Sequence, residues 1–124
     1  MEILHTHFVY INAITFSFSN VETSYYVDDG CHSEATNPDD VTGYYQAETS
    51  EAFVRCCSFD GTSCTTVNDC NDSDNLMSYS DAEDECSKIG MRLCTKDELL
   101  TEVCCGAGGG CDSAGVWTST PYGI

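Results

Sequence analysis

The sequence contains very few basic residues. Lysine and arginine together number 4, against 21 aspartates and glutamates in 124 residues, and the formal net charge at pH 7 is −17. Binding to a phosphate backbone relies on basic side chains, and anionic membrane surfaces attract the same side chains. We therefore expect no nucleic acid and no anionic membrane among the partners. A cationic partner or a divalent ion suits this charge.

Long hydrophobic runs are also missing. The apolar residues between positions 8 and 18 are interrupted by polar ones, and a membrane-spanning helix needs roughly 20 apolar residues in a row. No transmembrane span is therefore predicted. The stretch lacks the positive segment that precedes a signal sequence, while Ile14, Phe16 and Phe18 alternate as in a strand. Residues 1–19 are a degenerate leader, an added strand, or a start that omits the true leader.

Groups suited to nucleophilic catalysis are scarce. The three histidines, His5, His7 and His32, all lie near the N-terminus, and no Ser-His-Asp or Cys-His grouping is apparent. A reactive cysteine needs a neighbouring cation, and pairs of carboxylates arise by chance among so many acids. The glycines of residues 106–110 lack the lysine and the following helix of a phosphate-binding loop. We expect no enzyme activity.

Cysteine, by contrast, is abundant. No two cysteines have the C-x-x-C spacing that is common in structural zinc sites, and small domains gain stability from disulfides in oxidising compartments. We expect the two vicinal pairs to bridge different elements, and the short separation of Cys64 and Cys70 favours a local bridge. The sequence predicts a secreted or cell-surface protein with disulfides at Cys31, Cys56, Cys57, Cys64, Cys70, Cys86, Cys94, Cys104, Cys105 and Cys111.

Two short helices are predicted in the second half of the chain. The first begins with a capping box over residues 80–83, and Ala82, Cys86 and Ile89 follow at the spacing of one inward face. The second begins with a capping box over residues 95–98, and its Leu99, Leu100 and Val103 are expected to pack on the core. These helices place several apolar side chains and one cysteine in the interior.

Short buried strands are predicted over residues 52–57 and 116–118. Trp117 is expected in the core, and Arg55 and Arg92 are expected to pair with carboxylates of the scaffold. Residues 20–51 are polar, acidic and turn-rich, which indicates a loosely ordered lead-in held by Cys31. The disulfide-stapled core then comprises residues 52–124.

Oxygen-bearing side chains gather in residues 69–75. Asp69, Asn71, Asp72 and Asp74 are candidate calcium ligands, because calcium takes six to eight oxygen ligands. The segment does not match an EF-hand loop, and a solvated acidic loop is the alternative interpretation. Residues 71–73, Asn-Asp-Ser, also form a sequon for N-glycosylation.

Residues 79–119 carry a family resemblance. The pattern Tyr79-Ser80-x-Ala82-Glu83-x-x-Cys86-x-x-x-Gly90-x-Arg92-Leu93 resembles the opening of a C-type-lectin-like domain. The run from Arg92 to Leu99 is similar to the formylglycine-generating-enzyme branch of that fold, whose chemistry relies on a much larger domain. The whole string, through residues 116–119, resembles cysteine-rich modules in predicted secreted proteins of aquatic microalgae.

This resemblance implies a fold and part of a disulfide pattern. It implies that Cys86 bridges Cys56 or Cys57, and that Cys94 bridges Cys104, Cys105 or Cys111. The Glu-Pro-Asn or Gln-Pro-Asp loop and the Trp-Asn-Asp strand of calcium-dependent sugar sites are missing from the sequence, so sugar binding is not implied.

The sequence as a whole predicts a small secreted α+β domain, disulfide-rich and C-type-lectin-like, with two short helices and a few short strands. The expected function is non-catalytic extracellular binding of a protein, a glycan or a divalent ion. Calcium is the candidate ion, and no other cofactor is expected. The alternative is a structural component of a cell wall or matrix that has no discrete ligand.

Overall fold

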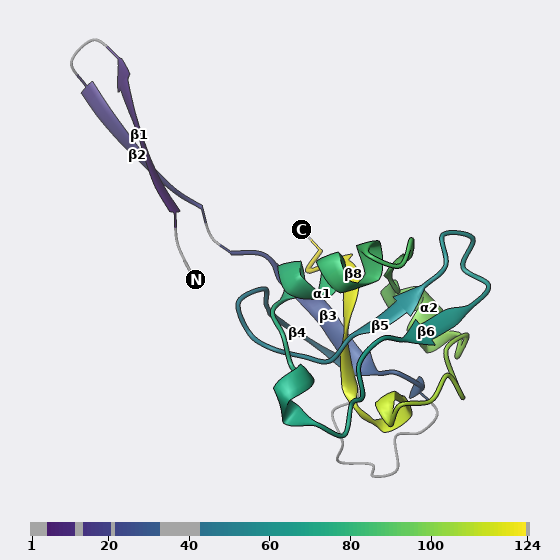
Figure 1. Cartoon of the computed structure of the whole chain (residues 1–124). Coiled ribbons are helices and arrows are strands. Elements are labelled where there is room, and N and C mark those ends of the chain that lie inside the picture. The colour runs from purple at the N-terminus through teal and green to yellow at the C-terminus, as the bar shows by residue number, and fades with distance from the viewer. Residues whose placement is uncertain (1–4, 12–13, 21, 33–42, 124) are drawn as a thin grey trace.

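The chain begins with a hairpin. The structure, a computed structural model, describes residues 5–11, 14–20, 22–32 and 43–123, and for the first two ranges it describes the backbone alone. Strands β1 (His5–Ile11) and β2 (Ile14–Asn20) pair antiparallel, with Ile11 opposite Ile14. Figure 1 shows this hairpin standing away from the other elements. The residues whose alternation predicted a strand lie in β2.

The first of two three-stranded sheets has the order β4-β3-β8 and is antiparallel throughout. Strand β3 (Ser24–Asp29) lies between β4 (Gly43–Ala47) and β8 (Gly115–Pro121), as Figure 1 shows. Val27 of β3 faces Trp117 of β8 in the register, and both side chains are fully buried. The sheet therefore joins segments from opposite ends of the chain.

The expectation of a loosely ordered lead-in is wrong for the described residues between 22 and 51, because β3 is the central strand of this sheet. The acidic composition did not indicate a strand here, yet Asp28 of β3 is buried and its carboxyl group is hydrogen-bonded. The Asp28 carboxylate accepts hydrogen bonds from the Tyr26 hydroxyl at 2.8 Å and from the Asp29 N–H at 2.7 Å. The core therefore begins well before residue 52.

The second sheet has the order β6-β5-β7 and is also antiparallel. It consists of β5 (Arg55–Cys57), β6 (Cys64–Thr66) and β7 (Arg92–Leu93). Phe53 connects the two sheets: its N–H donates to the Gly115 carbonyl at 3.0 Å, and its carbonyl accepts from the Trp117 N–H at 3.0 Å. Of the strand predicted at 52–57, residues 55–57 form β5 and Phe53 forms a bridge to Val116, and the strand predicted at 116–118 is found within β8.

Two short helices complete the domain, together with the 3₁₀ turns η2 (Ser73–Asn75) and η3 (Cys111–Ser113). Helix α2 (Lys96–Leu100) has the predicted capping box, in which Thr95 and Glu98 each bond the other's backbone N–H. Helix α1 (Tyr79–Ser87) instead begins two residues earlier than predicted, with Ser78 as its N-cap. Tyr79 is thereby inside the helix, and its ring is buried against Trp117.

The predicted inward face of α1 is confirmed for two residues and wrong for one. Ala82 and Cys86 are fully buried, but Ile89 is 47% exposed because the helix has already ended at Ser87. Of the apolar residues predicted for the second helix, Leu99 is buried and Leu100 is 37% exposed, while Val103 lies beyond the end of the helix and is partly buried. A five-residue helix presents only about one turn, so a single position faces the core.

All ten cysteines are disulfide-bonded, which confirms that prediction. Each vicinal pair bridges two different elements, and Cys86 pairs with Cys56 as the resemblance implied. The predicted local bridge between Cys64 and Cys70 is wrong, and so is the expected partner of Cys94. The pairs are Cys31–Cys105, Cys56–Cys86, Cys57–Cys94, Cys64–Cys104 and Cys70–Cys111.

The core has two parts, one around Trp117 and one around Leu99 and the disulfides. Trp117 is fully buried as predicted, and its indole N–H donates to the Met77 carbonyl at 2.8 Å. The protein is thus a small α+β disulfide-rich domain. No helix within the described ranges is long and apolar enough to cross a membrane.

Candidate functional site

A tight turn joins β5 to β6. The Ser58 N–H donates to the Ser63 carbonyl at 2.9 Å, and the Ser58 hydroxyl accepts from the N–H groups of Thr62 and Ser63 at 3.2 and 3.1 Å. Gly61 has φ +74°, a conformation that glycine adopts without strain. These bonds hold residues 58–63 in one conformation.

The acid of this turn is held in its charged form. The Asp60 carboxylate accepts hydrogen bonds from the Ser58 and Thr62 hydroxyls, each at 2.7 Å. The hydrogen bond from Ser58, followed by those from Thr62, lowers the pKa of Asp60 to about 2. The turn is therefore anionic at any physiological pH.

Phe59 lies in this turn with its ring in solvent. It is 71% exposed, the highest value for a large hydrophobic side chain among the described residues. An aromatic ring contributes much of its energy when it is buried, so Phe59 offers apolar surface for contact with a partner.

A groove of about 370 Å³ opens beside Phe59. Helix α1 supplies one wall and β7 supplies the floor, where Leu93 is buried. The groove is lined by Phe59, Glu83, Asp84, Ser87, Met91, Arg92, Leu93 and Ser119. It therefore combines apolar surface with two carboxylates and one guanidinium.

The Arg92 guanidinium is already paired. Its two terminal nitrogens donate to the two carboxylate oxygens of Glu98 at 2.7 and 2.9 Å, the scaffold pairing predicted for this arginine. The hydrogen bond from Arg92 is the main reason that the pKa of Glu98 is lowered. Because Glu98 compensates Arg92, the exposed Glu83 and Asp84 leave the groove with net negative charge.

The predicted calcium ligands lie together in one exposed loop. The Asp69 carboxylate accepts from the Asn71 N–H at 2.7 Å, and the Asp72 carboxylate accepts from the Asp74 N–H at 2.9 Å as the N-cap of η2. No three carboxylates of this loop come close enough together to share an ion. Two of its carboxylates thus bond the loop's own backbone, and calcium binding stays a prediction.

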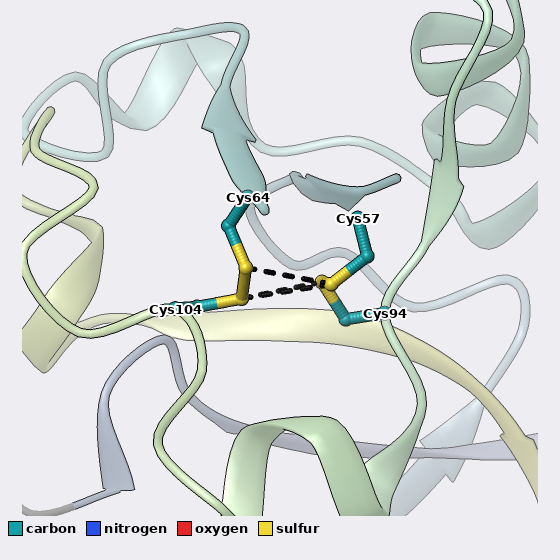
Figure 2. A group of neighbouring side chains, drawn as sticks. All are labelled: Cys57, Cys64, Cys94 and Cys104. Carbon is teal, nitrogen blue, oxygen red and sulfur yellow. Dashed lines mark hydrogen bonds between the residues drawn. A yellow bond between two sulfur atoms is a disulfide. The ribbon is translucent and has the colours of Figure 1, made fainter. Parts of the chain in front are cut away.

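Four cysteines form the one group of three or more thiol, imidazole or carboxylate ligands that converges within the described ranges. Their sulfur atoms all lie within 4.8 Å of one another, and Figure 2 shows the two disulfides side by side. The four-sulfur cluster consists of Cys57, Cys64, Cys94 and Cys104.

Sequence reasoning did not find the groove. Phe59 belongs to a Ser-Phe-Asp-Gly turn, and an aromatic residue in so polar a turn is the one local signal that could have singled it out. The position of Glu83 and Asp84 opposite that turn depends on the packing of α1 against β7, which no spacing along the chain reveals. No family model matches this chain, and no curated protein or solved structure matches it.

Proposed function

We propose that this protein is a non-catalytic extracellular binding module whose groove beside Phe59 accepts a cationic, partly apolar segment of another protein. The five disulfides support an oxidising, extracellular location, because such bonds persist there. The resemblance to C-type-lectin-like domains, with the Cys56–Cys86 bridge that it implies, supports a lectin-like binding scaffold.

The observation that carries the proposal is the exposed ring of Phe59 on a rigid turn. Binding energy at protein interfaces is concentrated in a few anchoring residues, often aromatic, that enter a well-packed contact. Ordering a flexible loop on binding costs free energy, and the hydrogen bonds of Ser58 and Asp60 make that cost small here. Phe59 thus presents apolar surface in a conformation ready for contact.

The charge of the groove defines the partner. Glu83 and Asp84 line it, Asp60 lies in the adjacent turn, and the whole chain carries −17. Such a field accelerates encounter with cations and disfavours acidic partners. A lysine or arginine can also stack on the face of an aromatic ring. A segment that combines a basic and an apolar residue satisfies both features of the groove.

The proposal is tested by selecting peptides from a random displayed library on the immobilised, oxidised chain. We expect enrichment of sequences that pair a basic residue with an apolar one. Phe59→Ala should weaken the selected peptides at least about tenfold, since anchors of this kind contribute more than 1.4 kcal/mol. Tyr122→Ala is the matched control, because Tyr122 is a 65% exposed aromatic outside the groove.

A second pair of variants tests the charge. Glu83→Gln with Asp84→Asn should weaken binding and reduce its salt dependence, whereas Asp97→Asn, an exposed acid outside the groove, should do neither. Selected peptides that bind the Phe59→Ala variant as tightly as the unsubstituted chain would contradict the proposed site. No enrichment at all would favour the alternative function, a cross-linked structural component without a discrete ligand.

A further inference from the structure

The four-sulfur cluster is assembled from four separate segments. Cys57 and Cys64 face each other across β5 and β6, Cys94 follows β7, and Cys104 follows α2. Between the two disulfides, the Cys57 sulfur lies 3.5 Å from that of Cys64 and 3.6 Å from that of Cys104. The Cys94 and Cys104 sulfurs are 3.5 Å apart. All four sulfurs therefore surround one point.

These distances suit a tetrahedral zinc ion. A Zn–S bond of about 2.3 Å places the sulfurs of a four-thiolate site roughly 3.8 Å apart. The contacts between the two disulfides already approach this separation. Once both bonds are reduced, the two sulfurs of each former disulfide have to separate by about 1.8 Å to reach the same spacing.

The backbone around the cluster is held by more than these two disulfides. Cys57 and Cys64 belong to a hydrogen-bonded strand pair, and Cys94 lies between β7 and the capping box of α2. The Cys104 carbonyl accepts from the buried Arg55 guanidinium at 2.9 Å, which holds the backbone at this cysteine. Three of the cysteines are buried, while Cys64 is partly exposed and connects the cluster to solvent.

We infer that the four-sulfur cluster is a redox-dependent zinc site, occupied when both of its disulfides are reduced. A dithiol reductant supplies two electrons to each disulfide and is itself oxidised to a disulfide. The four resulting thiols then release four protons on binding one Zn²⁺. No C-x-x-C spacing marks the site because each ligand comes from a different segment.

The test uses the full chain, produced in a reducing cytoplasm with zinc in the medium and purified without oxygen. Native mass spectrometry should find one zinc per chain, and the air-oxidised chain should bind none. Cys64→Ser with Cys104→Ser should abolish stoichiometric binding. Cys70→Ser with Cys111→Ser is the matched control, since it removes a disulfide outside the cluster and should retain one zinc.

Cobalt substitution of the wild-type reduced chain gives a readout that does not depend on how well a variant folds. Four thiolates around Co²⁺ give intense tetrahedral ligand-field bands and a sulfur-to-cobalt charge-transfer band. A reduced chain without stoichiometric zinc, folded or unfolded, overturns the inference. So does an octahedral cobalt spectrum, or zinc retained equally by both double variants. The groove is tested separately, on the oxidised chain.

Discussion

Arg55 shows how much of the scaffold depends on one side chain. Its guanidinium is fully buried and donates to the carbonyls of Gly30, Cys104 and Gly108 at 2.8–3.1 Å. It also pairs with Asp112 at 2.7 Å, as predicted for this arginine. One residue thus ties β5 to the segment after β3 and to the glycine-rich loop before η3.

Replacing Arg55 by methionine should be among the most damaging substitutions in the chain. The change leaves buried carbonyls and the partly exposed Asp112 carboxylate without their donor, and each buried group left unsatisfied costs about 1–3 kcal/mol. Arg92→Met is the matched control, because the Arg92–Glu98 pair is partly exposed and should cost about 1 kcal/mol or less. Urea unfolding of the oxidised variants measures both values. Equal losses would contradict the role assigned to Arg55.

At the scale of elements, the start of α1 is set by tertiary packing and not by the local capping pattern. Ser78 is buried and its hydroxyl accepts from the Asp81 N–H at 3.5 Å, whereas Ser80, which the capping-box pattern favoured, is exposed. The structure begins the helix at Tyr79 because the tyrosine ring stacks on Tyr25 at 3.6 Å between ring centroids. Because of this tertiary packing, the helix begins two residues before the start that the capping pattern predicted.

Alanine substitutions at the two serines check this assignment. Ser78→Ala should lower the free energy of unfolding by about 1 kcal/mol, the usual cost of losing an N-cap side chain. Ser80→Ala should change it by less than about 0.5 kcal/mol, as at most exposed positions. Thermal unfolding followed by circular dichroism gives both differences. If Ser80→Ala lowers the free energy of unfolding more than Ser78→Ala does, Ser80 is the N-cap, as the sequence indicated.

Elements marked by local chemistry could be predicted, and those that depend on distant partners could not. The capping box at Thr95 and the strand around Trp117 follow from neighbouring residues, and both are confirmed. Strand β3 escaped prediction because its buried Asp28 is satisfied by Tyr26 and His32, side chains whose arrangement no pattern indicates. The partner of Cys94 and the groove beside Phe59 depend in the same way on packing between separate segments.

For the whole molecule, the excess of acid opposes folding at neutral pH. Seventeen net negative charges repel one another in the compact state, and protonating exposed carboxylates relieves that repulsion. Other carboxylates act in the opposite direction. The pKa of Asp112 is lowered because the hydrogen bonds from Arg55 and from the Gly106 N–H outweigh the effect of burial. The pKa of Glu98 is lowered chiefly by the hydrogen bond from Arg92.

The lowered pKa values of Asp112 and Glu98 predict a loss of stability in acid. A carboxyl whose folded-state pKa lies below its unfolded value stabilises the fold above the unfolded pKa, and that contribution is lost as the pH falls through the folded pKa. The melting temperature should thus fall as the pH drops below about 4. Glu98→Gln should flatten the acid limb, because glutamine does not titrate, while Glu51→Gln, at an exposed position, should leave that limb unchanged. Calorimetry of the oxidised chain across this range measures the curves. An acid limb equally steep in both variants would show that the paired carboxylates do not control the acid response.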